Sequence, residues 1–83
     1  MTALHFAADR GYNEIVEFLV QNGASINAID SSGQTALMYA ASCENKETVE
    51  VLLRHGADST IRNSDGQSVA EFEDLPADIL ALF

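Results

Sequence analysis

The chain repeats itself every 33 residues, and this period constrains its fold more than any other feature. Thr2-Ala3-Leu4 returns as Thr35-Ala36-Leu37. When residues 2–28 are aligned with residues 35–61 without a gap, 11 of the 27 positions are identical. A repeat of this length is typical of arrays of stacked units, in which each unit buries its apolar face against its neighbours. The sequence therefore predicts a repeat array that binds other molecules through its surface.

Helix signals recur with the same period. Thr2 and Thr35 are suited to cap the first helix of each unit, because a threonine hydroxyl can accept from a free amide of the first turn. This helix is expected to end near Gly11 in the first unit and near Cys43 in the second. A second helix follows in each unit. It ends before a glycine that can adopt the left-handed conformation.

The second helices are predicted to turn an apolar side inward. In the first unit this side consists of Ile15, Val16, Phe18, Leu19 and Val20. In the second unit it consists of Val49, Val51, Leu52 and Leu53. Polar residues fill the other side, as expected for amphipathic helices at the surface of a small domain.

The segments that link the units, about residues 25–34 and 58–67, are polar and end in turn sequences. Asp30-Ser31-Ser32-Gly33 and Asn63-Ser64-Asp65-Gly66 both place Asp or Asn first and Gly fourth. These residues favour tight turns, because the side chain can bond to the following backbone and glycine tolerates positive φ. Each unit is therefore predicted to be two antiparallel helices followed by a projecting hairpin turn.

The repeat is complete only over part of the chain, which we interpret as one domain. We expect a first repeat at about residues 1–29, a second at about 30–62 and a degenerate capping repeat at about 63–83. In the last one, Glu73 and Asp74 replace the recurring Ala pair, Pro76 breaks the helix and a short apolar helix follows. Polar outward residues are what a terminal unit needs.

The first unit has no such polar replacements, since Leu4, Ile15 and Leu19 stay apolar. We therefore expect a chain excised from a longer protein. We also expect weak self-association through its exposed N-terminal face.

These landmarks resemble the ankyrin repeat, whose usual opening is Thr-Pro-Leu-His-x-Ala-Ala and whose period is 33. The run Thr2-Ala3-Leu4-His5-Phe6-Ala7-Ala8 carries the resemblance, together with Gly11, Ile15-Val16, Leu19 and Gly23-Ala24. It implies an all-α solenoid with two full repeats and a cap, non-catalytic binding of proteins, and a hydrogen bond from His5 to the threonine at the helix start. Met38 departs from the pattern at the histidine position. Glu44 replaces glycine, so the second inter-helix turn is expected to lack its left-handed residue.

A narrower resemblance concerns acyl-CoA-binding proteins that carry C-terminal ankyrin repeats. The matching residues include Gly33-Gln34-Thr35-Ala36-Leu37, Tyr39-Ala40, Cys43-Glu44 and Gly56-Ala57-Asp58. In that family a separate N-terminal helical domain binds the acyl-CoA, and nothing of that domain is present here. The resemblance implies that acyl-CoA is handled only through a domain outside this chain.

Charge limits the partners. With 13 acidic and 4 basic residues, the chain has a net charge of −9 and a pI near 4.2. Such a field repels nucleic acid and anionic membrane surfaces, so we expect neither, and favours a protein partner with a basic surface. The single cysteine, Cys43, excludes an internal disulfide and indicates a reducing compartment. We expect the cytoplasm, with the nucleus as the alternative.

No arrangement in the sequence predicts an enzyme, a cofactor or a metal. His5 and His55 lie 50 residues apart, without a cysteine or carboxylate at metal-ligand spacing. Ser42 and Cys43 have no neighbouring histidine, and no glycine-rich loop precedes a helix to hold phosphate.

The candidate binding residues are those at the hairpin tips and at the ends of the first helices, which stacking does not require. The ankyrin resemblance places the concave binding groove there. The predicted partner-binding residues are Asp9, Arg10, Ile29, Ser31, Ser32, Gln34, Ser42, Cys43, Arg62, Ser64, Asp65 and Gln67. Ile29 is the strongest candidate among them, because it is an apolar residue beside a turn. Phe6, Tyr39 and Phe72 recur at the period and are expected to form a packing ladder instead.

Three alternatives to this function remain open. The chain could be an ankyrin module from an unrelated scaffold or signalling protein. It could be a structural spacer, or it could regulate a neighbouring domain of its own protein.

Overall fold

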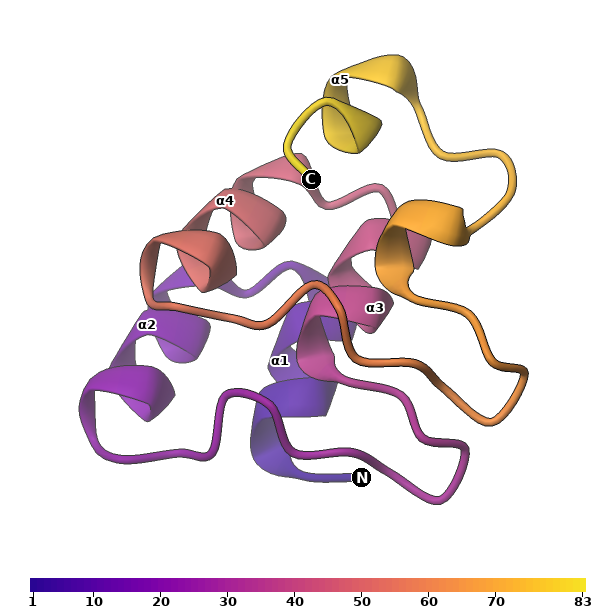
Figure 1. Ribbon diagram of the computed structural model, residues 1–83. Coiled ribbons are helices and arrows are strands. Elements are labelled where there is room, and N and C mark those ends of the chain that lie inside the picture. The colour runs from indigo at the N-terminus through magenta and orange to yellow at the C-terminus, as the bar shows by residue number, and fades with distance from the viewer.

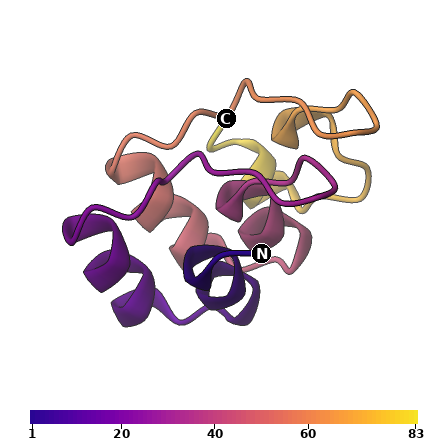
Figure 2. The same ribbon diagram turned by 90° about the horizontal axis from the view of Figure 1, so that it is seen from below.

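The computed structural model describes all 83 residues and contains helices and turns but no strands. Its elements form three successive layers, each with one element nearer the hairpins and one farther away (Figure 1). The view from below shows the same order, with the N-terminal pair at one end (Figure 2). The elements are α1 (Ala3–Arg10), α2 (Asn13–Gln21), α3 (Ala36–Ser42), α4 (Lys46–Arg54), the 3-10 helix η1 (Val69–Glu71) and α5 (Ala77–Leu80).

Both first helices begin at the predicted threonines. The Thr2 hydroxyl accepts from the backbone N–H of His5 at 3.3 Å. The Thr35 hydroxyl accepts from that of Met38 at 3.2 Å. Met38 also takes part in the cap, because its sulfur accepts from the Thr35 N–H at 3.5 Å. The departure from histidine at this position therefore leaves the start of the helix intact.

The turn between α3 and α4 corrects one expectation. Gly11 ends α1 in the left-handed conformation, with φ of 70°. Glu44 occupies the corresponding place, and its φ is 58°. The expectation that this turn would lack a left-handed residue was wrong, since Glu44 itself adopts the conformation at a cost of roughly 1–2 kcal/mol for a residue with a Cβ.

The core lies between the first two layers. The helix α1 packs on α3, and α2 packs on α4. Ala7, Ala8, Ala40 and Ala41 are at most 1% exposed, and these small side chains let the helix backbones approach closely. Larger apolar residues, such as Val16 and its period-related partner Val49, fill the remaining space. Stacking of neighbouring units thus supplies the burial that one unit could not achieve alone.

The last layer is a reduced unit that covers the second one. The helix η1 packs on α3, and α5 packs on α4. Val69 and Ile79 are each 1% exposed, so both elements contribute to the core. The side chains of Glu73, Asp74 and Asp78 are exposed on this layer. The predicted fold, two full repeats closed by a degenerate cap, is confirmed.

The inward side predicted for α2 was wrong at two positions. Ile15 is 49% exposed and Phe18 is 63% exposed. Their equivalents in the second unit, Thr48 and Val51, are 1% and 5% exposed because the first unit covers them. The side of α2 that carries Ile15 and Phe18 therefore faces away from the rest of the chain.

The linking segments form the predicted hairpin turns and project from one side of the stack (Figure 1). In the first, Gly33 donates its N–H to the Asp30 carbonyl at 3.0 Å. In the second, Gly66 donates to Asn63 at 2.9 Å. The turns are joined by a hydrogen bond of 3.0 Å from the Ser64 N–H to the carbonyl of Ser32.

Candidate functional site

A polar groove of about 570 Å³ lies where the hairpin turns meet the ends of α3 and η1. Four of the predicted residues line it together with three others. The lining residues are Gln34, Ser42, Asn63, Asp65, Gln67, Phe72 and Glu73. The structure thus brings side chains from two hairpins, one helix end and the capping layer to one place.

The first residue of each turn holds its hairpin in shape. The Asp30 carboxylate accepts from the N–H groups of Ser32 at 2.9 Å and Gln34 at 3.0 Å. The Asn63 side-chain oxygen accepts in the same way from Asp65 at 2.9 Å and Gln67 at 3.1 Å. Asn63, which itself lines the groove, therefore positions the two other lining residues of the second hairpin, Asp65 and Gln67.

A polar network fixes the base of the first hairpin. The Tyr39 hydroxyl of α3 donates to the Asp30 carboxylate. This bond raises the pKa of Tyr39 to about 12 and is the main reason that the pKa of Asp30 is lowered. The His5 ring packs edge-on against Tyr39 with centroids 5.5 Å apart.

His5 connects α1 to the same hairpin. Its Nε2 donates to the Gln34 carbonyl at 2.8 Å. Its Nδ1 accepts from the Thr2 N–H at 3.1 Å and contacts the Thr2 hydroxyl at 2.8 Å. Since a carbonyl can only accept, the neutral ring with its proton on Nε2 satisfies all these contacts. Both ring nitrogens of this buried histidine are therefore engaged in hydrogen bonds that stabilise the fold.

Two predicted residues, Asp9 and Cys43, lie together outside the groove lining. The Cys43 thiol donates to the Asp9 carboxylate at 3.1 Å. This bond, helped by burial, raises the pKa of Cys43. A thiol held in its protonated form is a poor nucleophile.

The other predicted residues lie on several parts of the surface. Ile29 is 58% exposed, and Ser31, Ser32 and Ser64 are exposed at the turns. Arg10 lies 5.0 Å above the ring of Phe6, away from the groove lining.

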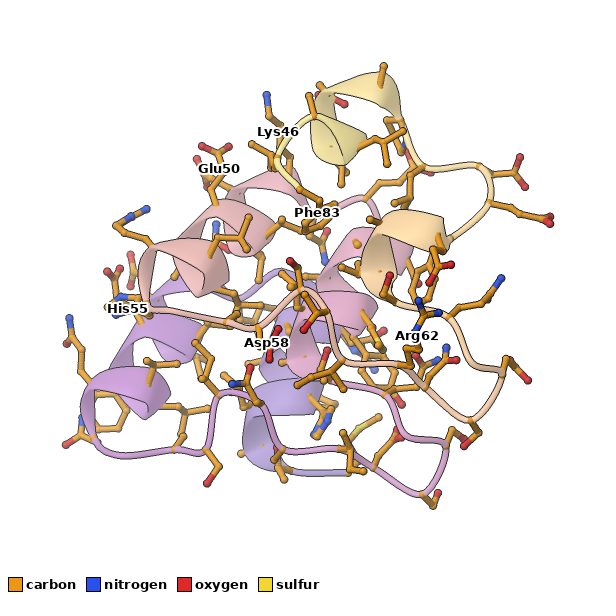
Figure 3. The ribbon with its side chains drawn as sticks, viewed as in Figure 1. Lys46, Glu50, His55, Asp58, Arg62 and Phe83 are labelled. Carbon is orange, nitrogen blue, oxygen red and sulfur yellow. The ribbon has the colours of Figure 1, made fainter.

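The remaining predicted residue, Arg62, is held by contacts within the chain. It points from the second linking segment toward η1 (Figure 3). It donates to the Gly66 carbonyl at 2.6 Å and to Glu71 at 2.7 Å. Its guanidinium therefore braces the hairpin against the capping layer.

Sequence reasoning missed Asn63, Phe72 and Glu73 as groove residues. Phe72 was expected in a packing ladder, but the aromatic pairs are His5 with Tyr39 and Phe6 with Tyr12. The capping layer has a short η1 in place of a full helix, which leaves Phe72 half-buried at the groove. The sequence carries one signal for these residues. Glu73 replaces the first alanine of the recurring pair, which marks the layer in which the short η1 stands in place of a full first helix.

The groove has a negative electrostatic character. Asp65 and Glu73 are part of its lining, and no lysine or arginine is. Every basic side chain of the protein lies within 4 Å of a carboxylate. The pairs are Arg10 with Asp9, Lys46 with Asp78, Arg54 with Glu17 and Arg62 with Glu71. Nine of the thirteen acidic residues therefore have no lysine or arginine partner.

No group of three or more His, Cys, Asp or Glu side chains is arranged to hold a metal ion. None of the helices combines the length and the apolar character needed to cross a membrane.

Comparison with known proteins agrees with the stacked helix pairs. The family model described as ankyrin repeats (3 copies) matches residues 1–63. The chain is 56% identical over 32 residues to the E3 ubiquitin-protein ligase XBAT33 of Arabidopsis thaliana. That match covers 39% of this chain and 6% of the relative. It is also 56% identical over 34 residues to a putative ankyrin repeat protein of Rickettsia bellii (strain RML369-C), covering 41% of this chain and 14% of the relative. With its period, its helix pairs and a family match over most of its length, the chain belongs to the ankyrin-repeat family.

Proposed function

We propose that this chain binds a basic segment of a protein partner through its hairpin turns and the groove between them. Ankyrin repeats are generally non-catalytic modules for protein interaction, which supports binding as the general function. The observation that carries the specific proposal is the groove itself. It combines two carboxylates with amide and hydroxyl groups and one aromatic ring, and has no basic side chain.

Each part of the groove suits one part of such a ligand. The side chains of Gln34, Asn63 and Gln67 carry both donors and acceptors, which can pair with an extended peptide backbone. The half-buried ring of Phe72 offers an apolar surface to the alkyl stem of a lysine or arginine. The carboxylates of Asp65 and Glu73 attract the charged head.

Ile29 is an exposed apolar residue on the linking segment that also carries the groove residue Gln34. It is 58% exposed on the linking segment, although its neighbours in sequence, Ala28 and Asp30, are partly buried. Energy in protein interfaces is concentrated in a few apolar or aromatic anchors surrounded by polar groups. We infer that Ile29 is such an anchor at the edge of the bound segment.

Selection of peptides from a random library on the 83-residue chain tests the proposal. We expect the selected peptides to be rich in lysine and arginine. Their affinity should fall at least tenfold when Asp65 and Glu73 are both changed to lysine. It should also fall as salt is raised from 0.05 to 0.5 M, because screening weakens attraction between exposed charges.

The matched control changes the same amount of charge elsewhere. Glu14 and Glu50 are exposed on α2 and α4, and Glu50 lies on the outer side of α4, away from the hairpins (Figure 3). The double variant Glu14→Lys, Glu50→Lys should keep most of the affinity. If both double variants lose affinity equally, only the net charge matters and the groove proposal fails. If Ile29→Asp and Arg62→Glu change no interaction at all, the chain is a structural spacer.

We further propose that the repeats serve a larger cytoplasmic protein that handles acyl-CoA through a separate domain. The resemblance of residues 33–62 to the repeats of such proteins supports this, and the matches cover only 6% and 14% of the two relatives described above. Adding the chain to a separately produced acyl-CoA-binding domain of the parent would show whether it alters ligand binding there. No effect would favour the repeats of an unrelated scaffold protein.

We also propose that the chain associates weakly with itself through the N-terminal side of the first unit. The exposed apolar residues Ile15 and Phe18 support this second interaction.

A further inference from the structure

Phe72 is the one aromatic residue in the groove lining, and the repeat gives its ring two counterparts. Phe6, Tyr39 and Phe72 follow one another at intervals of 33 residues. In the second unit the Tyr39 hydroxyl donates to Asp30, and its ring meets His5 edge-on. The same repeat position therefore carries an aromatic ring three times, in three different surroundings.

In the first unit this ring binds an arginine side chain. The guanidinium of Arg10 lies over Phe6, with its central carbon 5.0 Å from the ring centroid. The carboxylate of Asp9 lies 3.9 Å from the Nε atom of the same guanidinium. The planar cation thus contacts both the face of a ring and a carboxylate. Both contacts suit the flat, weakly hydrated guanidinium better than a compact ammonium group.

The capping layer has the ring and the carboxylates of this arrangement but no cation. Arg10 follows Phe6 by four residues, which places both side chains on one side of α1. The residue four places after Phe72 is Pro76, and the backbone of Phe72 is extended rather than helical. Asp65 and Glu73 line the groove with Phe72, and no lysine or arginine does. The ring therefore lacks the basic side chain that its counterpart in α1 has.

The arginines of the chain are engaged elsewhere. Arg62 is the basic residue nearest to Phe72 in the sequence, and it donates to the Gly66 carbonyl and to Glu71. It is not part of the groove lining. Arg54 of α4 lies beside a carboxylate of α2. A guanidinium that occupies the groove must therefore come from outside these 83 residues.

The groove also provides the acceptors that an arginine requires. A guanidinium carries five N–H donors in one plane, whereas an ammonium group carries three donors at one point. Asp65 belongs to the second hairpin and Glu73 to the capping layer, and the side-chain oxygens of Ser42 and Gln67 are part of the same lining. A planar fork can donate to several of these acceptors while its face lies on the ring of Phe72.

We propose that the groove is selective for arginine, and that the guanidinium of one arginine stacks on Phe72 while it donates to the carboxylates beside it. This inference rests on the proposed function, because it specifies which basic side chain of the bound segment enters the groove. The carboxylates attract lysine and arginine alike. Phe72 is then the residue that distinguishes them, since stacking of a planar group is available only to arginine.

Titration calorimetry with two peptides of equal charge, hexa-arginine and hexa-lysine, tests this selectivity. We expect hexa-arginine to bind about fivefold more tightly, a ratio of the size that a cation–π contact at a partly exposed ring contributes. Phe72→Leu should remove most of this ratio, because it keeps an apolar side chain but loses the aromatic face. Phe72→Tyr keeps the aromatic face and should keep the ratio.

Two control variants make the same changes outside the groove lining. Phe83→Leu alters another half-buried aromatic residue that packs against the core, and it should leave the ratio unchanged. Asp74→Asn removes a charge next to the groove residue Glu73. Glu73→Gln should weaken the binding of hexa-arginine more than Asp74→Asn does. Far-UV circular dichroism checks that each variant remains helical.

Two results would overturn the selectivity and leave binding in the groove intact. One is equal affinity of the wild-type chain for the two peptides. The other is a ratio that Phe83→Leu lowers as much as Phe72→Leu does. If neither peptide binds, or if the double change of Asp65 and Glu73 to lysine does not weaken binding, the proposed function fails and the selectivity fails with it.

Discussion

At the scale of single residues, the contact between Tyr39 and Asp30 stabilises the first hairpin, which contributes Gln34 to the groove. The phenol of α3 donates to a carboxylate that also accepts from two backbone amides of the first hairpin. A hydrogen bond to a charged acceptor is typically worth about 1.5–3 kcal/mol, more than one between neutral groups. The position of Gln34 in the groove therefore depends on a helix residue that does not line it.

Tyr39→Phe should lower the free energy of unfolding by about 1.5 kcal/mol at pH 7, the lower end of that range because the site is partly exposed. Urea denaturation measures it. The control Tyr12→Phe removes a hydroxyl for which the structure shows no hydrogen bond, and it should change stability little. Equal losses in the two variants would show that the Asp30 contact adds nothing.

The same pair predicts how stability changes with pH. The folded pKa of Tyr39 is raised to about 12 from about 10, so its contribution is complete below pH 10 and is lost as pH rises toward 12. The folded pKa of Asp30 is lowered, so its contribution is present above about pH 4 and is lost as pH falls through the folded value. Urea denaturation of Tyr39→Phe should show a weaker loss of stability than the wild-type chain between pH 10 and 12. An identical loss in both proteins would contradict the assignment.

At the scale of elements, the two hairpins are coupled by a direct backbone contact. The Ser64 N–H donates to the Ser32 carbonyl, and a Cβ built on Gly33 would lie only 2.9 Å from that nitrogen. Gly33 has a φ of 72°, which residues with a Cβ rarely adopt. Glycine is thus required at position 33 for two reasons. It tolerates the positive φ, and it lets the next hairpin approach closely.

Gly33→Ala and Gly66→Ala form a matched pair. Both glycines have positive φ, at 72° and 75°, but a Cβ on Gly66 would meet nothing within 4 Å. Gly66→Ala should cost about 1–2 kcal/mol for the backbone conformation alone. Gly33→Ala should cost more and should also weaken peptide binding, because the hairpins must separate. Thermal denaturation and peptide titration measure the two effects, and equal costs would mean that the contact between the hairpins is unimportant.

At the scale of the whole molecule, stability depends on stacking from one layer to the next. The N-terminal unit covers the second unit, and the capping layer covers it from the other side through Val69 and Ile79. In an array of this kind, each layer contributes through its contact with its neighbour. The small η1 and α5 should therefore matter for the stability of the entire chain, although they resemble loops more than a full repeat.

Ile79→Ala should destabilise the protein by about 2–5 kcal/mol, since it removes a buried side chain and leaves a cavity. The neighbouring residue Leu80 is 45% exposed, and Leu80→Ala should cost much less. Urea denaturation followed by circular dichroism at 222 nm compares the two variants. A small effect of Ile79→Ala would show that contact between the capping layer and α4 contributes little to stability.

Most of the architecture could be predicted from the sequence. The period located both helix pairs, the threonine caps and the glycine-ended turns, because each depends on residues within a few positions of one another. The groove could be predicted only in part. Gln34, Ser42, Asp65 and Gln67 do line it, whereas Phe72 and Glu73 were assigned to packing and capping. Their place in the groove depends on how short η1 is, which a decayed repeat does not reveal.

By itself, the sequence determined the repeat, the order of helices and turns, and the polar cap, since spacing and local chemistry are sufficient for these. Only the tertiary structure decided which apolar side chains are buried. Ile15 and Phe18 follow the helical pattern as well as Val16 does, but burial requires a neighbour, and the neighbouring unit lies on only one side of α2. The structure likewise decided that every basic side chain lies beside a carboxylate. Lys46 meets Asp78 and Arg54 meets Glu17 only because the layers are stacked. The groove, in contrast, keeps Asp65 and Glu73 without a lysine or arginine in its lining.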